Sequence, residues 1–420
     1  MGNSSRALDD LLEAVLQRRA SQNRLRQLTV PAAGAIDFSS NGYLCLATNA
    51  EVRASFLGRL QQQSSLALGS GGSRLLDGNT TTVEALEASI AAFHGADAGL
   101  LFNSGFDANT GLFGSVPQAE DVVVYDELIH ASVHDGLRQS RARRAMAFAH
   151  NCVWQEQGQH LLPSLAQLLA ALADAGGNVF VAVESVYSMD GDLAPLNDIV
   201  ACIQQRLPRG NGYLVVDEAH ATGWLGEHGR GLVSHLGLEQ DVWARIHTFG
   251  KALGCGGAIV LSSPSTRSYL INYARSFIYT TALGFPSLAA IEAVYDHLKS
   301  GRVERQVRHL RFLMQHAHDL VVSLCARHET PPSVLRVGSG PPQSPIIPLF
   351  TAHARQLARH CQNKGFTIRP IVAPTVPIGT DRVRLCLHAE NSVQQVQSLC
   401  GAIEQWLCGE MDKGRSRSKF

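Results

Sequence analysis

The sequence lacks the features of several protein classes. No apolar run approaches the roughly 20 residues that a membrane span requires, and the first ten residues have no apolar core of a secretory signal. The nine cysteines stand singly, with no Cys-x-x-Cys pair, which is typical of reduced thiols inside a cell. We therefore expect a soluble intracellular protein without a membrane span.

A net charge is also absent. The chain has 36 basic and 36 acidic residues, and no long block of one sign occurs before the last few positions. Nucleic-acid binding depends on a basic surface, which this composition does not indicate. We expect neither a nucleic-acid partner nor a metal site.

What the sequence does contain indicates an α/β fold. Short, continuously apolar runs alternate with helical stretches up to about residue 290, and such runs suit parallel strands that are buried on both faces. The expected strands are residues 100–102, 122–125, 179–183, 213–216 and 257–261. The predicted parts are an N-terminal helix and strand segment (1–50), a large domain with a mostly parallel sheet (51–290), a smaller C-terminal α/β domain (291–412) and a flexible tail (413–420).

Polar residues end several of these runs. Residues 103–105, Asp126, Glu184 and residues 217–218 each follow an apolar run directly. Because the sites of open α/β sheets lie beyond the carboxyl ends of the strands, we expect these side chains to gather there.

Asp217, His220 and Lys251 form the most informative group. Asp217 ends a strand with His220 three residues later, and Lys251 follows in a glycine-flanked segment. Pyridoxal 5'-phosphate (PLP) needs a lysine amine for its Schiff base and a carboxylate that keeps the pyridine nitrogen protonated. Taken alone, the aspartate could be a helix cap or ion-pair partner and the lysine a solvated side chain, so the combination carries the prediction.

Two further features are weaker by themselves. Ser104, Gly105 and Phe106 lie between a strand and a probable helix, an arrangement that binds phosphate at a helix N-terminus, although a plain turn explains it equally well. His130 follows the strand at 122–125 and could stack on an aromatic cofactor, but a lone histidine is more often structural.

Five segments together resemble the α-oxoamine synthase family, a group of PLP enzymes of fold type I that work as dimers. They are residues 69–74 (GSGGSR), 188–192 (SMDGD), 217–223 (DEAHATG), 248–254 (TFGKALG) and 369–377 (RPIVAPTVP). The resemblance covers about residues 10 to 408.

The resemblance implies how the cofactor is held. Lys251 would form the Schiff base, Asp217 would pair with the ring nitrogen, His130 would stack on the ring, and His220 and Ser188 would bind near the 3-hydroxyl. The implied phosphate contacts are Ser104, Gly105, Phe106 and Thr248, with Thr280 and Thr281 from the partner subunit of a homodimer whose active site lies at the subunit interface.

The resemblance also implies substrate contacts. Arg384 matches the arginine that binds the amino-acid carboxylate, and Asn41 matches a residue near the substrate. Arg26 and Thr375 match positions that contact the acyl substrate, and Arg24 is a rival for the role of Arg26. The chain departs from the usual pattern at Gly42, Cys45 and Val83, which puts the substrate in question and leaves the PLP chemistry intact.

The implied reaction joins an amino acid to an acyl-CoA with loss of carbon dioxide, giving an α-aminoketone. Within the family, the chain is most similar to the members that join L-alanine to pimeloyl-CoA in biotin biosynthesis. The alternatives are a relative in a specialised pathway with another acyl thioester or amino acid, a non-catalytic partner subunit, and an aminotransferase.

The last three residues suggest a location. Ser418, Lys419 and Phe420 resemble the Ser-Lys-Leu peroxisomal address, with basic residues just upstream. We expect a peroxisomal protein, with the cytoplasm as the alternative.

Overall fold

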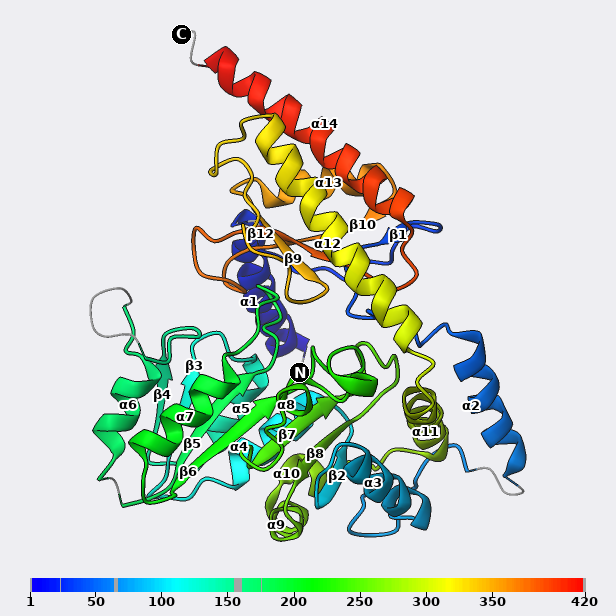
Figure 1. Ribbon diagram of the computed structural model, residues 1–420, viewed down its shortest axis with the longest axis vertical. Helices are drawn as coiled ribbons and strands as arrows, with labels where there is room; N and C mark the ends of the chain where they lie inside the picture. Colours follow the sequence, from blue (N-terminus) through cyan, green and yellow to red (C-terminus); the bar gives the residue numbers. More distant parts are fainter. Residues whose placement is uncertain (1, 23, 64–66, 155–160, 175, 418–420) are drawn as a thin grey trace. The chain divides into compact units, whose positions relative to one another are not determined.

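The computed structural model of the protein describes residues 2–22, 24–63, 67–154, 161–174 and 176–417 (Figure 1). The chain divides into two compact units, Met1–Ile36 and Asp37–Phe420. The first unit contains helix α1 (Gly2–Ser21), and the second contains the sheets and the remaining helices. The predicted address at residues 418–420 lies outside the described residues.

The elements after α1 follow in the order that an α/β chain requires. The helices are α2 (Ala50–Gln62), α3 (Thr81–Phe93), α4 (Gly105–Ser115), α5 (Ala131–Gln139), α6 (Leu165–Leu172), α7 (Leu196–Arg206), the 3-10 turn η1 (Glu227–Gly229), α8 (Leu232–Leu236), α9 (Pro264–Tyr273), α10 (Arg275–Ile278), α11 (Phe285–Lys299), α12 (Glu304–Arg327), α13 (Ala354–Asn363) and α14 (Val393–Arg417). The strands are β1 (Ile36–Asp37), β2 (Ala98–Phe102), β3 (Val122–Asp126), β4 (Arg144–Phe148), β5 (Val179–Glu184), β6 (Gly212–Asp217), β7 (Ala244–Thr248), β8 (Ala258–Ser262), β9 (Ile346–Phe350), β10 (Phe366–Thr367), β11 (Arg369–Ile371) and β12 (Arg382–Cys386).

A seven-stranded sheet in the order β2-β8-β7-β6-β5-β3-β4 confirms the predicted α/β class. The pairs from β7 to β4 are parallel, whereas β8 runs antiparallel to both β2 and β7. The expectation that the run at 257–261 joins a parallel sheet is therefore wrong in direction. The physical reason is the short connection of residues 249–257, which leaves no room for a crossover helix.

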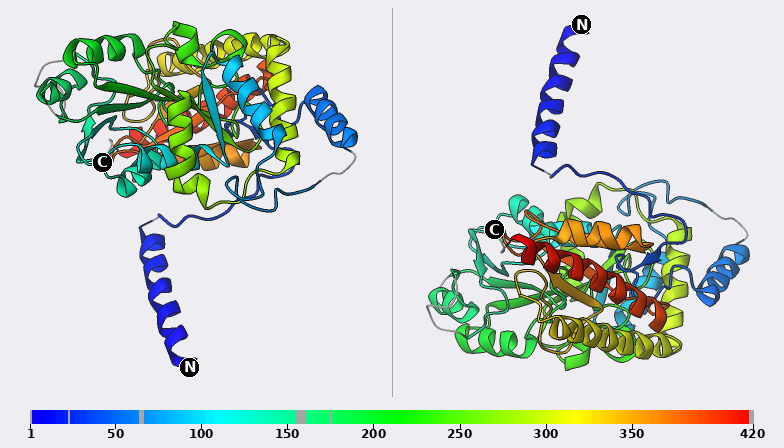
Figure 2. Two further views of the ribbon diagram at one scale, coloured as in Figure 1. Left: turned by 90° about the horizontal axis from the view of Figure 1, so that it is seen from below. Right: turned by 90° about the horizontal axis from the view of Figure 1, so that it is seen from above.

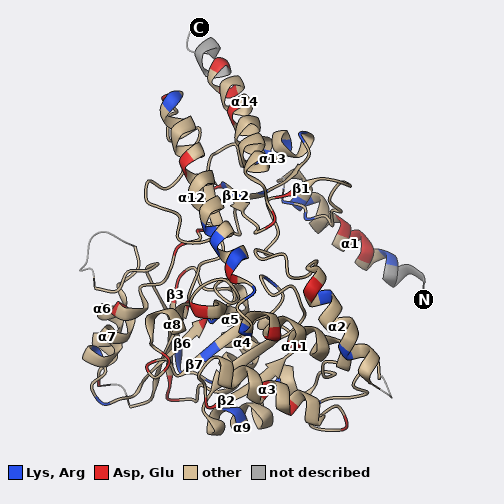
Figure 3. Cartoon of the chain, turned by 45° about the vertical axis from the view of Figure 1, so that its right-hand side comes forward, with Lys and Arg blue, Asp and Glu red and all other residues tan. Residues whose placement is uncertain are grey.

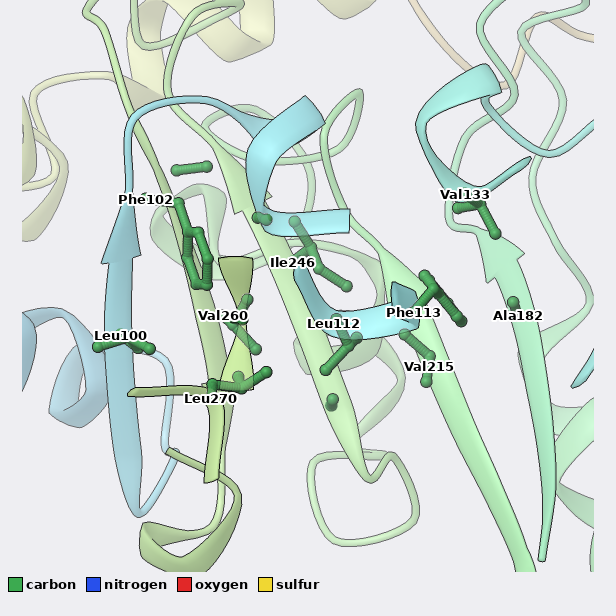
Figure 4. Packing of buried hydrophobic residues seen from close by; sticks show 14 of the residues in the cluster. Leu100, Phe102, Leu112, Phe113, Val133, Ala182, Val215, Ile246, Val260 and Leu270 are labelled. Atoms are coloured by element: carbon green, nitrogen blue, oxygen red, sulfur yellow. The ribbon is translucent and has the colours of Figure 1, made fainter. Parts of the chain in front are cut away.

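Both faces of this sheet are covered. Val123, Phe180 and Val215 belong to a core cluster that includes Leu112 and Phe113 of α4 (Figure 4). Neighbouring residues of a strand point to opposite faces of the sheet. The residues adjacent to these three in their own strands are also buried, and they face the other side of the sheet. This explains why the strands are continuously apolar in the sequence.

Strands β4 and β7 were missed in the sequence. β4 pairs only with β3, at the edge of the sheet, and has exposed residues at its start. β7 contains Arg245 and His247, both buried, which break its apolar pattern. Their partners lie far away in the sequence: Arg245 donates to the carbonyl of His94 at 3.0 Å.

The C-terminal part contains an antiparallel sheet in the order β11-β12-β9. Helix α14 packs beside α12 and α13, as the red, yellow and orange helices of Figure 2 show. Helices α11 and α12 precede this sheet in the chain. Helix α14 reaches Arg417, beyond residue 413, where we expected a tail to begin.

Charged residues of both signs are interspersed over the elements (Figure 3). In the part of the chain that the structure describes, no helix is long and apolar enough to cross a membrane. Within the same residues, no group of three or more His, Cys, Asp or Glu could hold a metal ion.

Candidate active site

The carboxyl ends of the parallel strands gather polar side chains at one edge of the large sheet. Asp126 ends β3, Glu184 ends β5, and Asp217 ends β6 directly opposite Glu184 in the register. Thr248 ends β7, and Lys251 lies in the connection from β7 to β8. The sheet topology therefore brings together residues that are more than 100 positions apart.

Asp217 is almost completely buried, and neutral donors hold its carboxylate. Its Oδ2 accepts a hydrogen bond from Nδ2 of Asn109 at 2.8 Å, and its Oδ1 accepts one from the backbone N–H of Ala219 at 2.9 Å. Asn109 lies on α4 and is 1% exposed. Sequence reasoning missed Asn109, because its burial and its contact with Asp217, 108 residues away, depend on the packing of α4 against the sheet.

Asn109 also connects Asp217 to His130. Its Nδ2 donates to Oγ of Ser132 at 3.0 Å, and this oxygen lies 2.7 Å from Nδ1 of His130. Because the backbone N–H of Ser132 also donates to Nδ1 of His130, at 3.2 Å, the ring proton belongs on Nε2. His130 caps α5 and has an exposed ring, so the network fixes the orientation of an available flat face.

Lys251 and Glu184 have strongly perturbed acid–base properties. Burial lowers the pKa of the Lys251 ammonium, while the charges of Asp217 and Glu184 act in the opposite direction. Burial, together with the charge of Asp217, raises the pKa of Glu184 well above its usual range. The site therefore favours the neutral acid at Glu184 and the neutral amine at Lys251.

The N-terminus of α4 forms a corner suited to an anion. Ser104 caps the helix by accepting from the N–H of Asp107 at 3.1 Å. A Cβ on Gly105 would lie 2.1 Å from Oγ1 of Thr248, so only glycine permits this approach. Helix N–H groups and a threonine hydroxyl therefore converge there, beside the half-exposed Phe106.

Thr280 and Thr281 lie near the same corner within one chain. Nδ2 of Asn103 donates to Oγ1 of Thr280 at 3.1 Å and to the carbonyl of Thr281 at 2.9 Å. Both threonines precede α11 in a segment that also contacts residues near 70: the N–H of Ala282 donates to the carbonyl of Gly72 at 2.9 Å. Within one chain, Asn103 thus fixes the segment that contains the two threonines, and the contact of the partner subunit's threonines with the phosphate stays a prediction.

Arg384 faces the site from strand β12. Its Nη1 donates to the carbonyl of Ser188 at 2.8 Å, and its Nη2 donates to Oδ1 of Asn41 at 2.6 Å. All of these acceptors are neutral, so the guanidinium charge is available to a carboxylate. The structure brings the predicted residues Arg384, Asn41 and Ser188 together, and their roles stay predictions.

His220 lies buried behind the same corner. Its Nδ1 is 2.8 Å from the hydroxyl of Tyr43, and its carbonyl accepts from Nε1 of Trp224 at 2.7 Å. Burial and the charges of Lys251 and Arg384 lower the pKa of His220 well below its usual value. His220 is therefore neutral in this environment.

The segment that contains Ser188 is fastened to the sheet by His150. Nδ1 of His150 lies 2.9 Å from Asp126, and Nε2 lies 2.8 Å from Asp192. Burial alone would lower the pKa of His150, but hydrogen bonds to these two carboxylates raise it to about 10. Sequence reasoning did not identify His150, because its partners lie 24 and 42 residues away.

The two remaining predicted substrate residues are Arg26 and Thr375. Arg26 belongs to the unit Met1–Ile36, and its role stays a prediction. Thr375 is exposed in the loop between β11 and β12, where its N–H donates to the carbonyl of Val372 at 3.0 Å. Its role also stays a prediction.

The three positions that depart from the family pattern have different local surroundings. Cys45 has a φ of 56°, a conformation that favours the glycine usual at this position. A Cβ on Gly42 would meet only Oγ of Ser40, at 3.4 Å, so the backbone does not demand glycine there. Val83 lines a small pocket that also contains Arg74, Asn103 and Thr280.

Comparisons with known proteins give matches over most of the chain. Residues 33–403 match the family model of aminotransferase class I and II. An 8-amino-7-oxononanoate synthase of Emericella nidulans is 48% identical over 99% of this chain and 100% of its own length. The aminoacyl transferase sphA of Aspergillus fumigatus is 36% identical over 94% of this chain and 86% of its own.

The fold agrees as well. A serine palmitoyltransferase from S. paucimobilis, solved with a bound PLP-myriocin aldimine, superposes with a TM-score of 0.80 at 24% identity. The match covers 95% of this chain and 97% of the other.

Proposed function

Because the chain belongs to the aminotransferase class I and II family, in its α-oxoamine synthase branch, we propose that it condenses an amino acid with an acyl-CoA on PLP bound to Lys251. The fold is the α/β fold of the PLP-dependent transferases of type I. The observation that carries the proposal is that Lys251 and Asp217 lie at the carboxyl ends of the strands of the large sheet, with Arg384 of β12 in the smaller sheet near enough for its charge to act on Lys251. The chain is also 48% identical to an 8-amino-7-oxononanoate synthase.

The residues present fit the cofactor. Lys251 would form the Schiff base, Asp217 would hold the proton of the pyridine nitrogen, and the flat ring of His130 would cover the cofactor face. The corner at Gly105 fits the phosphate, because a Cβ there would collide with Thr248. The other contacts are Ser104 and Phe106 at the phosphate, Ser188 and His220 near the 3-hydroxyl, and Thr280 and Thr281 from the partner subunit.

When bound, PLP supplies an electron sink for a carbanion at the α-carbon of the amino acid. Arg384 binds and orients the carboxylate with two parallel N–H donors. The neutral amine of Lys251 accepts the α-proton, because burial lowers the pKa of its ammonium. Asp217 is buried and held by the neutral N–H donors of Asn109 and Ala219, and its buried position excludes water from this contact.

We further propose L-alanine and pimeloyl-CoA as substrates and 8-amino-7-oxononanoate, a biotin precursor, as the product. The support is the similarity to the Emericella nidulans enzyme of that name over the whole chain. Asn41, Arg26 and Thr375 are the further substrate contacts in this proposal.

A second candidate is an α-oxoamine synthase that takes a different acyl thioester, and the 36% identity to sphA of Aspergillus fumigatus supports it. The two candidates are distinguished by ranking the kcat/KM values of different acyl-CoA donors, measured with L-alanine. Pimeloyl-CoA should have the highest kcat/KM, and a higher value for a simple fatty acyl-CoA of similar length favours the second candidate.

Arg384→Ala should chiefly impair use of the amino acid. Removing one partner of a buried, hydrogen-bonded charge pair costs about 2 to 5 kcal/mol, which corresponds to a fall in kcat/KM for the amino acid of roughly 30-fold or more. Steady-state kinetics at saturating acyl-CoA measure this. Arg336→Ala is the control, because Arg336 is exposed and lies over the ring of Phe350. Unchanged use of the amino acid by Arg384→Ala would remove Arg384 from the site.

A homodimer is part of the proposal, with the second copy covering an apolar surface beside the phosphate corner. Leu68 is 80% exposed, Leu76 77% and Tyr279 72%, while Phe106 is 45% exposed. Hydrogen bonds join the segments near 70 and 280, so these side chains share one region. Sedimentation that gives the mass of a single 45.3 kDa chain contradicts the homodimer.

For localisation, we propose that Ser418, Lys419 and Phe420 act as a peroxisomal address. The support is the sequence pattern alone: a small residue, a cation and a large apolar residue, with basic residues upstream. A fluorescent protein fused ahead of residues 411–420 should collect in peroxisomes and become diffuse when Phe420 is deleted. A diffuse signal that ignores the deletion contradicts the proposal.

A further inference from the structure

A chain of hydrogen bonds joins Arg384 to His220 through Tyr43. Oδ1 of Asn41 accepts from Nη2 of Arg384 at 2.6 Å and lies 3.3 Å from the hydroxyl of Tyr43. The same hydroxyl lies 2.8 Å from Nδ1 of His220. Tyr43 is 0% exposed and His220 is 4% exposed, so water does not compete for these bonds.

The hydroxyl of Tyr43 has one hydrogen and two possible acceptors. Oδ1 of Asn41 already accepts a short bond from the charged Arg384, and the distance to His220 is the shorter of the two. The hydrogen of Tyr43 therefore points to Nδ1 of His220 in this structure. Because His220 is neutral, its own proton then lies on Nε2.

The opposite arrangement is also chemically complete. If Tyr43 donates to Asn41, its oxygen accepts from a proton on Nδ1 of His220, and Nε2 of His220 becomes an acceptor. Tyr43 and His220 carry one proton each in both arrangements. In the second arrangement the additional proton is on the cofactor: the oxygen that His220 would contact through Nε2 takes up one proton from solvent. This step rests on the proposed function, in which His220 contacts that oxygen.

The two arrangements are selected by whether a substrate carboxylate is bound to Arg384. Nη2 of Arg384 donates to Asn41 and, at 3.5 Å, to the carbonyl of Ser39, while Nη1 donates to Ser188. A carboxylate held by two parallel N–H bonds displaces one acceptor of Nη2 and shares the guanidinium charge. Either effect leaves Oδ1 of Asn41 free to accept from Tyr43.

We propose that Tyr43 is a positioning residue that reports the occupancy of the carboxylate site at Arg384 to His220. Binding of the amino acid turns the hydroxyl of Tyr43 toward Asn41, moves the proton of His220 to Nδ1 and favours the protonated form of the cofactor. The site thus takes up a proton when the carboxylate arrives.

The charged and titratable groups around Tyr43 and His220 are the same in the unsubstituted protein and in Tyr43→Phe. Lys251, Arg384 and His130 act on His220, and Cys386 and Arg384 act on Tyr43. Tyr43→Phe removes the hydroxyl alone, so a difference between the two proteins reports the relay.

Propionate is the probe, because it has the carboxylate of the substrate and no amine. The visible absorbance of the holoenzyme is titrated with pH, with and without saturating propionate. In the unsubstituted protein, propionate should raise the pH midpoint of the absorbance change by on the order of one pH unit. The reason is that the deprotonated cofactor oxygen then loses the hydrogen bond from His220 that stabilises its charge. In Tyr43→Phe the rise should be less than half as large, because only the charge of propionate still acts.

Tyr295→Phe is the matched control. Tyr295 is also buried, and its hydroxyl lies 3.2 Å from Nε2 of His94, away from Arg384. This variant should respond to propionate as the unmodified protein does. An equally small rise in Tyr295→Phe overturns the relay, because the effect then belongs to any buried tyrosine.

The remaining outcomes are also decisive. The same rise in the unmodified protein and in Tyr43→Phe overturns the relay and leaves the proposed function intact. No rise in the unmodified protein overturns both the relay and the role of Arg384. Asn41→Ala removes the acceptor between Arg384 and Tyr43 and leaves the buried tyrosine in place, so it should also reduce the rise in the pH midpoint. If Tyr43→Phe does not fold, the result with Asn41→Ala decides whether the relay exists.

Discussion

Lys251→Ala should lose the cofactor adduct that borohydride fixes to the unmodified, yellow protein. Lys251 lies in the β7–β8 connection beside Asp217 and Glu184, and burial lowers the pKa of its ammonium, which favours the neutral amine that bond formation needs. The same amine is the proposed acceptor of the α-proton, so turnover should fall by at least about a thousandfold. Mass spectrometry of the reduced protein and a turnover assay measure the two effects.

Lys364→Ala is the control for this experiment. Lys364 is exposed at the end of α13, so the adduct and the turnover should remain as in the unmodified protein. A reducible adduct that persists in Lys251→Ala would place the cofactor on another amine and defeat the assignment.

Asp217→Asn should retain the cofactor and lose most of its activity. A neutral amide does not hold the proton of the pyridine nitrogen, so the electron sink weakens. The expected fall in kcat is on the order of a hundredfold or more, the size typical of removing one preorganised electrostatic partner.

The structure adds a second consequence for this variant. Asn109 donates its amide N–H to Oδ2 of Asp217, and the N–H of Ala219 donates to Oδ1, so the new amide nitrogen meets a donor on either side. Asp241→Asn is the control, since Asp241 is exposed. Normal turnover of Asp217→Asn, with the cofactor bound, would contradict the role of Asp217.

The large sheet and its polar edge were predictable because both depend on local patterns. Continuous apolar runs identify β3, β5 and β6, and the residue after each run lies at the carboxyl edge by geometry alone. The direction of β8 was not predictable from its composition, since the short connection that contains Lys251 decides it.

The support of the site was harder to predict, because it depends on contacts between distant segments. Asn109 links Asp217 with Ser132, and Tyr43 lies 177 residues from His220, to which it bonds. Each is an ordinary residue in its local sequence and acquires its role from the packing of α4 or of the segment near 40 against the sheet edge. Apolar patterns and turn signals contain no information on such pairs.

The most direct test of the proposed function is to mix the purified protein with L-alanine and pimeloyl-CoA and to measure free thiol and carbon dioxide together. We expect both to appear in a one-to-one ratio, with neither when alanine or the acyl-CoA is omitted. An aminotransferase would instead give a keto acid without thiol, and a non-catalytic partner subunit would give neither product. Either result, obtained with the cofactor bound, would contradict the condensation.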